Sequence, residues 1–490
     1  MSLIERRVPR LARWWRGRRG TWWWAIVVIV VPVAIVAGTA VTLLLSLVDA
    51  GDPKNRIELI KTGLTVGAGT GGVVALVLAG RRQWSTEHDA AERRMTELYV
   101  KAVEQLGSDK AAVRHGGLYA LERVAQDNPD HRQTVVNVLC AYLRGPFTLP
   151  GEQRPRQRRG IRRPLAPAPR GGVSSTPQTG QTENPTVAEL DDEARQEREV
   201  RLTAQRIIAA HLKPGKDSDH PVDTFWANLD LDLTGATLID FNLDDTHLRT
   251  GTFANTVFIG ETWFFAVNFQ EQADFTDASF VGDAEFIGAR FAGYAWFNGT
   301  SFAEEAWFSN ARFTQDTQFR KARFTGDARF NGASFAGYTT FSDASFTKHA
   351  DFNESSFTKH AAFLGTSFAG RAQFIEASFN AGVQFNGATF SGASFKGASF
   401  NGDNSARETG FSTDASFIGV SFTSWTSFAR ASFAMDARFS KASFTKDTQF
   451  TDVTFVRKPD LSDAVFELGM PESLRAHVAE ADDPDRAGAG

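Results

Sequence analysis

Phenylalanine recurs along the C-terminal half of the chain in alternating steps of five and six residues. The series starts at Phe253, continues at positions 258, 264, 269, 275, 280, 286 and 291, and holds to Phe390. A small residue stands two places before most of these rings, as in Ala278-Ser279-Phe280. Residues two apart in an extended strand point to the same side, so each ring and its small companion face inward together. The spacing predicts one short unit repeated many times around a phenylalanine core.

The composition supports a single repeated unit and argues against an enzyme. The chain has 42 Phe but only 5 Tyr and 4 Met, whereas an irregular globular core mixes side-chain sizes. Cys140 is the sole cysteine, so it forms no internal disulfide and no multi-cysteine zinc site. Acidic residues in the repeats fall at outward or corner positions without a recurrent pair, and the sequence lacks a Walker loop or an HExxH motif. We therefore expect no catalytic residues, no cofactor and no metal.

The repeat begins with leucine at positions 233, 238, 243 and 248 and then changes to phenylalanine. It resembles the pentapeptide-repeat family, whose motif is A-(D/N)-L/F-x-x, and in particular the variant with an eleven-residue double unit. The resemblance covers about Ala227 to Phe466. It implies a mainly β fold, a right-handed quadrilateral β-helix over residues 225–467, with one repeat on each side. The structural core is then expected to include Phe253, Phe258, Phe264, Phe275, Phe280, Phe286, Phe291, Phe330 and Phe335.

The alternating steps predict the shape of each turn of the helix. If every six-residue step widens a corner by one residue, a coil has 22 residues and its two wide corners lie diagonally opposite. The positions from Phe253 to Phe466 give about ten coils, and the leucine start adds about one more. At a strand spacing of about 4.8 Å the rod is about 50 Å long.

The series has one fault. After Phe390 the expected six-residue step has only five, and the next central positions are Phe395, Phe400 and then Ala406, where a ring is missing. An alanine there predicts a void. We expect a distortion over residues 401–410, with the coil bent inward or a loop leaving the wall. A partner contact is expected on that irregular surface, at Asn401, Asp403, Asn404, Arg407 and Glu408.

The N-terminal segment predicts membrane attachment. Residues 1–21 are basic, and Trp22 to Val48 form an uncharged apolar run longer than the roughly 20 residues that span a bilayer. The run is too long for a cleaved signal peptide, which is the alternative. A second apolar stretch, Leu59 to Ala79, completes two transmembrane helices over residues 22–80. If the second stretch spans, both chain ends face the cytoplasm; if it does not, the repeats face the opposite side.

Glycines in the second stretch allow further interpretations. Gly63, Gly67 and Gly71 are spaced four apart, which permits close helix packing and a homodimer in the membrane, although such glycines are also simply tolerated there. Residues 67–72 also match G-x-G-x-x-G, the phosphate-binding turn of a dinucleotide-binding enzyme. That remote alternative requires further strand and helix units, which do not follow in the sequence.

The middle of the chain predicts helices and a linker. Residues 81–145 show helical spacing, with Leu98, Ala102 and Leu106 on one face, and resemble a HEAT-like module of three helices. Residues 146–190 are rich in Pro, Arg, Gly, Ser and Thr and predict a disordered linker. Residues 191–224 are expected to form a capping helix and the entry to the repeats, and residues 468–490 a C-terminal cap and tail.

Together these features predict a non-enzymatic protein-protein interaction scaffold of the bacterial cell membrane. It is expected to be multi-pass, to contact lipid through two helices, and to present its repeat domain in the cytoplasm to a protein partner that the sequence does not identify. An alternative follows from the family resemblance, since some members mimic DNA and regulate a topoisomerase. The repeats carry 27 Asp and Glu, but 18 interspersed Lys and Arg break any continuous acidic stripe, and no specific nucleic acid is expected as a partner.

Overall fold

The structure is a computed structural model that describes residues 53–147, 149, 187–217 and 219–479, together with a few positions between 31 and 46. The chain divides into two units, residues 1–98 and residues 99–490.

Helix α2 (Pro53–Leu106) begins in the first unit and runs without a break through residues 67–72. The glycine-rich motif there is helical and does not form the turn between a strand and a helix that the dinucleotide-binding alternative requires. Over the residues described, no helix is both long enough and apolar enough to cross a membrane. Most of the apolar run from Trp22 to Val48 lies outside the described residues, as do the side-chain surroundings of Gly63, Gly67 and Gly71.

The second unit starts with a helical module. The end of α2 is followed by α3 (Ala111–Asp127), the short helix η2 (Pro129–His131), α4 (Arg132–Arg144) and α5 (Val187–His211). The chain breaks between these helices at residues 107–110 and at Asn128, and the first helix of the predicted three-helix module is the end of α2. Leu98 is 56% exposed, so it does not belong to the predicted apolar face, while Ala102 and Leu106 are buried.

Helix α5 packs on both α3 and α4, and its buried side chains belong to their core. Helices α3, α4 and α5 therefore pack as one body, which combines the later helices of the predicted module with the predicted capping helix. All but the two ends of the predicted linker 146–190 lie outside the described residues.

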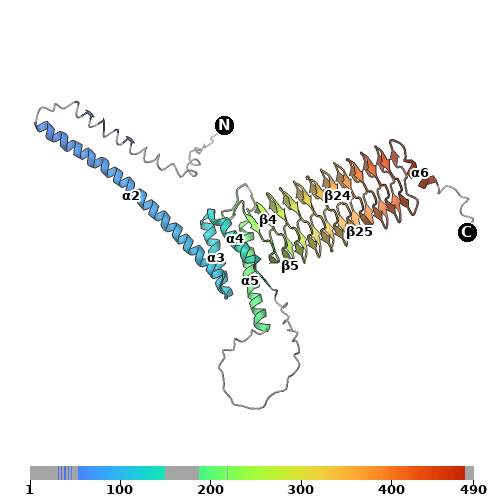
Figure 1. The fold of residues 1–490 in the computed structure, drawn as a ribbon, viewed down its shortest axis with the longest axis horizontal. Helices are drawn as coiled ribbons and strands as arrows, with labels where there is room; N and C mark the ends of the chain where they lie inside the picture. Colours follow the sequence, from blue (N-terminus) through green and yellow to red (C-terminus); the bar gives the residue numbers. More distant parts are fainter. Residues whose placement is uncertain are drawn as a thin grey trace, which may run out of the picture. The chain divides into compact units, whose positions relative to one another are not determined.

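The repeats form a β-solenoid of four walls (Figure 1). The first wall is an 11-stranded parallel sheet of β1 (Asp230–Asp232), β4 (Thr250–Thr252), β8 (Ala273–Asp274), β12 (Ala295–Trp296), β16 (Thr317–Gln318), β20 (Thr339–Thr340), β24 (Ala361–Ala362), β27 (Val383–Gln384), β30 (Asn404–Ser405), β34 (Thr426–Ser427) and β38 (Thr448–Gln449). The fourth wall is a second 11-stranded sheet of β3 (His247–Leu248), β7 (Asn268–Phe269), β11 (Arg290–Phe291), β15 (Arg312–Phe313), β19 (Ser334–Phe335), β23 (Ser356–Phe357), β26 (Ser378–Phe379), β29 (Ser399–Phe400), β33 (Ser421–Phe422), β37 (Ser443–Phe444) and β40 (Val465–Phe466).

The second and third walls are linked into one 18-stranded sheet. The second wall contains β2 (Thr237–Ile239), β5 (Val257–Ile259), β9 (Ser279–Phe280), β13 (Ser301–Phe302), β17 (Arg323–Phe324), β21 (Ser345–Phe346), β31 (Gly410–Phe411), β35 (Ser432–Phe433) and β39 (Thr454–Phe455). The third wall contains β6 (Thr262–Trp263), β10 (Ala284–Glu285), β14 (Ala306–Trp307), β18 (Ala328–Arg329), β22 (Ala350–Asp351), β32 (Ala415–Ser416) and β36 (Ala437–Arg438). Two strands, β25 (Ser367–Gln373) and β28 (Thr389–Ser394), run from the second wall into the third.

The register places identical positions of successive coils over one another. Phe302 pairs with Phe324, 22 residues later, and Phe324 pairs with Phe346. The rings of Phe308 and Phe330 stack with centroids 4.9 Å apart and planes 3° apart. All nine phenylalanines predicted for the structural core are buried. The predicted coil of 22 residues with an inward-facing ring on each wall is confirmed.

The two kinds of corner differ in backbone conformation. At the five-residue steps the second corner residue adopts positive φ, as at Asp277 (55°), Lys321 (57°) and Gly288 (66°). This left-handed residue turns the chain within two positions. The six-residue steps have a third corner residue and mostly turn without positive φ. Since the steps alternate around the coil, the wide corners lie diagonally opposite, as predicted.

The fault near Ala406 lies inside the wall. The corner after Phe390 is one residue shorter than the pattern requires. Strands β25 and β28 continue across this corner, and their pairing register shifts between Phe368 and Arg371. Beyond it the ladder continues: the Ala406 amide donates to Ser427 O at 2.7 Å, and Asn404 pairs with Thr426. The predicted loop leaving the wall is therefore wrong, because backbone pairing does not depend on the missing ring. The predicted void is confirmed as an internal cavity beside Ala406.

Both ends of the solenoid are covered. At the start, the Gln205 side chain on α5 donates to Ile239 O at 2.7 Å and accepts from Ile239 N at 3.1 Å. Gln133 on α4 makes the same pair of bonds to Asp230, both at 2.9 Å. At the other end, α6 (Glu472–Ala479) buries Leu474. The predicted N-terminal and C-terminal caps therefore lie against the first and last coils.

Candidate interaction surface

A column of large outward side chains distinguishes the third wall. Trp263, Glu285, Trp307 and Arg329 occupy equivalent positions on β6, β10, β14 and β18. Each follows an inward small residue and precedes an inward phenylalanine, so alternation along the strand directs it to the surface. On later coils the same position carries Asp351, Gln373, Ser394 and Ser416. We call the four residues from Trp263 to Arg329 the tryptophan column.

One half of this column contains an arginine, an aromatic ring and carboxylates. The Arg329 guanidinium lies over the Trp307 ring, 5.6 Å from its centroid. It pairs with Glu305 at 2.8 Å and with Asp327 at 3.7 Å. Glu305 also accepts a hydrogen bond from the Trp307 indole N–H at 3.0 Å. The tryptophan face and its flanking carboxylates thus hold a cation by cation–π attraction and charge.

The other half of the column has an equivalent arrangement of a tryptophan and carboxylates, with a glutamate in place of the arginine. Glu285 stands one coil above Trp263, as Arg329 stands above Trp307. Partial burial raises the pKa of Glu285 above its usual value, and the charges of Asp244, Glu261 and Asp283 raise that pKa further. Like charges close together disfavour ionisation, so these carboxylates form a local negative field that a cation would relieve.

The first wall, which lies opposite, carries a separate pair of aromatic residues. Tyr294 is 50% exposed and stacks with Trp296, with centroids 6.4 Å apart. The outward position of the fourth wall carries serine on six successive coils, from Ser334 to Ser443. The tryptophans at outward strand positions, Trp263, Trp296 and Trp307, therefore lie on early coils of two opposite walls.

Comparison with known families agrees with the geometry. The family model described as pentapeptide repeats (9 copies) matches residues 264–312 and again residues 308–356. The chain is a pentapeptide-repeat protein. The matched residues lie within the solenoid and include Glu285, Trp307 and Arg329. No curated protein shows significant similarity to the chain.

The residues predicted as a partner contact lie on one coil of the pentapeptide-repeat solenoid, near the cavity. Asn401, Asp403, Arg407 and Glu408 are exposed, whereas Asn404 is 4% exposed and faces inward. The exposed four are tied to adjacent coils, for example through Asn401 Nδ2, which donates to Asn380 Oδ1 at 3.0 Å, and through the ion pair of Glu408 with Arg430. Asn404 therefore faces the interior and is not accessible to a partner protein. A contact at the other four residues stays a prediction.

The sequence contained a signal for the tryptophan column that the inward pattern concealed. The outward position of this pentapeptide-repeat protein is usually small or polar, so tryptophan at 263, 296 and 307 is exceptional. Aligning the chain at 22-residue spacing would have placed Trp263, Glu285, Trp307 and Arg329 in one column. Over the described part of the chain, no group of three or more His, Cys, Asp or Glu is arranged to hold a metal ion.

Proposed function

We propose that this pentapeptide-repeat protein is a non-enzymatic, membrane-anchored scaffold that binds a partner protein through the tryptophan column. The observation that carries the proposal is the Trp263–Glu285 pair beside Asp283. It repeats the arrangement around Trp307 and carries an acid where Arg329 stands. A stiff solenoid supports such a role, because stacked coils hold the column in a fixed geometry and binding costs little ordering.

The partner segment is expected to present an arginine or lysine. Such a side chain would lie over the Trp263 ring and pair with Glu285 and its neighbouring carboxylates, as Arg329 lies over Trp307 and pairs with Glu305. Tryptophan is the aromatic ring that attracts cations most strongly. Aromatic residues that stack and exclude water also dominate the energetics of protein interfaces.

Proximity labelling in native cells tests this function, with the labelling enzyme fused after Gly490 of the full chain. The double variant Trp263→Ala/Trp307→Ala is expected to lose one or more labelled proteins that the unaltered chain labels. Trp296→Ala, on the opposite wall, is the matched control and is expected to retain them. If the double variant folds and labels the same proteins, the tryptophan column is not the contact.

Charge reversal tests the sign of the partner. Glu285→Lys is expected to abolish the labelling, while Asp343→Lys, an exposed corner residue on another part of the coil, makes the same change in net charge and is expected to preserve it. Equal labelling by both variants would mean that the partner does not present a cation at this place.

The membrane anchor rests on the sequence, namely the basic residues 1–21 and the uncharged run from Trp22 to Val48. With two spans, 22–80, the solenoid faces the cytoplasm. A reporter fused after Gly490 tests this orientation: cytoplasmic fluorescence is expected, and phosphatase activity on the far side would reverse the assignment.

A DNA-mimicking regulator of a topoisomerase is the second candidate. Glu261, Asp283, Glu305 and Asp327 occupy successive coils at one corner and form a short acidic stripe. The stripe ends at His349 and Arg371, which take the same position on the next two coils. Supercoiling by a type II topoisomerase in the presence of the full chain decides between the two functions, and inhibition at micromolar concentration would favour mimicry.

A further inference from the structure

A single column of stacked rings in the first wall is interrupted at Ala406. From Phe253 to Phe385 the rings of this column stack on their neighbours with centroids 4.7–5.0 Å apart, and Phe428 stacks on Phe450 at 5.1 Å. Ala406 keeps its place in the backbone ladder between Phe385 and Phe428. Phe385 and Phe428 are two coils apart, so their rings are separated by about 10 Å. One further ring would fit between them and stack on both.

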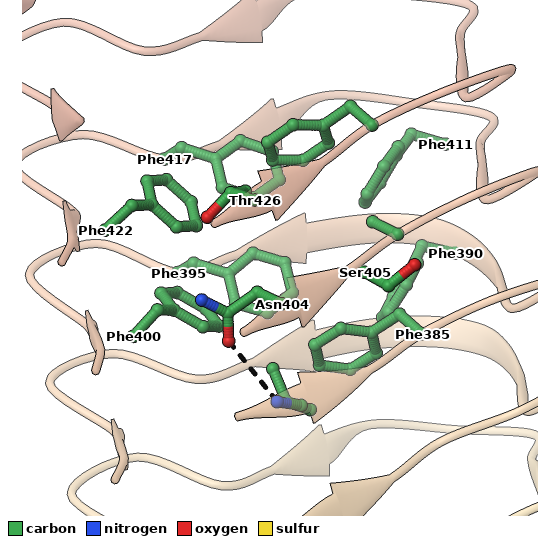
Figure 2. Close-up of a pocket in the computed structure, with 13 residues that line it drawn as sticks. Phe385, Phe390, Phe395, Phe400, Asn404, Ser405, Phe411, Phe417, Phe422 and Thr426 are labelled. Atoms are coloured by element: carbon green, nitrogen blue, oxygen red, sulfur yellow. Dashed lines mark hydrogen bonds between the residues drawn. The ribbon is translucent and has the colours of Figure 1, made fainter. Parts of the chain in front are cut away.

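The place of that ring is a cavity (Figure 2). It is lined chiefly by phenylalanine rings, including Phe385, Phe395, Phe417 and Phe428. Its volume, measured as the space open to the centre of a water-sized sphere, is about 20 Å³. A water molecule needs about 10–15 Å³ by this measure, so the space exceeds one water. Phe385 retains 5% exposure here, whereas Phe363 one coil away has 0%.

The Phe385 ring, which borders the gap, is only slightly tilted relative to the rest of its column. Phe385 is inclined by 16° to Phe363, whereas Phe363 is inclined by 3° to Phe341. Neighbouring coils are held by backbone pairs on every wall, so they cannot close a gap of one ring. The cavity therefore persists in the folded chain.

Three polar residues line this cavity, Asn404, Ser405 and Thr426, and among them only Asn404 has a buried side-chain atom without a hydrogen-bond partner in the described part of the chain. Asn404 is the inward residue two places before Ala406, and Figure 2 shows its amide among the Phe395 and Phe400 rings. Its Oδ1 accepts from the Val383 amide at 3.3 Å. Its Nδ2 is buried and has no hydrogen-bond partner among the described residues. The equivalent residues on adjacent coils are Val383 and Thr426, so the amide is particular to the coil that lacks a ring.

We propose that this cavity binds a single-ring aromatic molecule of the phenol class. The ring would lie between Phe385 and Phe428 and restore the stack, and the hydroxyl oxygen would accept a hydrogen bond from Asn404 Nδ2. Water fits less well, because a buried water makes about three hydrogen bonds and the surface of this cavity is almost entirely apolar. A benzene ring without an oxygen would fill the space and leave the amide donor unpaired.

Thermal unfolding of the full-length protein in detergent tests this site with phenol and benzene as probes. Phenol is expected to raise the unfolding temperature in a saturable way, with an affinity about tenfold above that of benzene, since one satisfied buried donor is worth about a factor of ten. Ala406→Phe fills the cavity with the chain's own ring and is expected to remove the response to both probes. A phenol response of equal size in the unaltered chain and in Ala406→Phe would overturn the proposal.

A second variant covers the case in which Ala406→Phe fails to fold. Asn404→Val removes the donor and matches Val383 of the preceding coil. It is expected to bind benzene and to lose the tenfold preference for phenol, as measured by saturation-transfer NMR. If phenol gives no saturation transfer with the unaltered chain, the cavity holds water at most and is no binding site. If Asn404→Val keeps the preference, the amide plays no part in recognition.

Discussion

The side-chain amide of Gln205 pairs with both backbone polar groups of Ile239, so a helix residue completes the edge of the first coil. An uncovered edge strand exposes unpaired amide and carbonyl groups that template aggregation. Gln133 does the same for Asp230 on the first wall. Two glutamines from two helices thus take the place of a preceding coil.

Gln205→Leu is expected to lower the free energy of unfolding by about 2–4 kcal/mol, because it leaves a buried donor and a buried acceptor of Ile239 unpaired. Urea unfolding followed by tryptophan fluorescence measures the change, since the buried Trp226 stacks on His211 of the helix that carries Gln205. Gln449→Leu, an exposed glutamine on the first wall, is the control and is expected to change stability by no more than about 0.5 kcal/mol. Equal effects of the two substitutions would mean that Gln205 does not cap the edge.

Cys140 is expected to be inert in the folded chain. It is 1% exposed, and burial raises the pKa of its thiol to about 12. At pH 8 its thiolate fraction is therefore roughly 10³-fold below that of an exposed cysteine, and only the thiolate reacts. A disulfide reagent should modify Cys140 only after urea is added, while Ser412→Cys adds an exposed thiol that reacts at once. Rapid reaction of Cys140 without urea would show that the helical module opens readily.

The repeated core could be predicted because stacking fixes the inward residues. A ring every five or six residues with a small companion satisfies one geometry, and all nine predicted core phenylalanines are buried. Residues on the outside are free of that constraint. Trp263 and Trp307 therefore do not alter the spacing of the inward rings, and their shared column follows from the 22-residue register and not from the inward pattern.

The backbone path at Ala406 and the packing of α5 could not be predicted from the sequence, because both depend on contacts between residues far apart in the chain. The missing ring at Ala406 suggested a displaced loop, but the amide of that residue pairs with Ser427 whatever its side chain is. More than forty residues separate α5 from α4 in the sequence, although α5 packs on both α3 and α4. Helical spacing alone does not show which helices pack together.

Acid is expected to weaken the first coil through Asp230. The hydrogen bond from Arg249 holds the pKa of Asp230 below its usual value, and Thr250 lowers it further. Because this pKa is lower in the folded chain than in the unfolded chain, the stabilisation is complete above about pH 4 and is lost as the pH falls through the folded value. The stability difference between the unaltered chain and Asp230→Asn should therefore shrink on going from pH 7 to pH 3.

Urea midpoints at several pH values measure that difference. Asp452→Asn, at an exposed corner of the last coils, serves as the control and is expected to show a small difference at every pH. A gap between the unaltered chain and Asp230→Asn that stays constant down to pH 3 would contradict the linkage.

A second gap in the ring stack is expected to be costly. Phe330 lies between Phe308 at 4.9 Å and Phe352 at 4.7 Å, and it is fully buried. Phe330→Ala should lower the free energy of unfolding by about 3–5 kcal/mol, because the neighbouring coils cannot collapse onto the space. Ser345→Ala, outward on the second wall, is expected to cost no more than about 0.5 kcal/mol. A loss below about 1 kcal/mol for Phe330→Ala would show that the solenoid repacks.

Hydrogen exchange at Ala406 should reveal how the cavity affects the wall. The Ala406 amide donates to Ser427 O and the Phe341 amide donates to Ala362 O, both at 2.7 Å on the first wall. The two hydrogen bonds match, so a difference in exchange rate must come from packing. We expect Ala406 to exchange at least about tenfold faster in native-state measurements, since each 1.4 kcal/mol lost from the cost of local opening gives a factor of ten. Ala406→Phe should bring position 406 to the rate of Phe341. Equal rates in the unaltered chain would mean that the missing ring does not weaken this coil, and that the backbone ladder alone sets its stability.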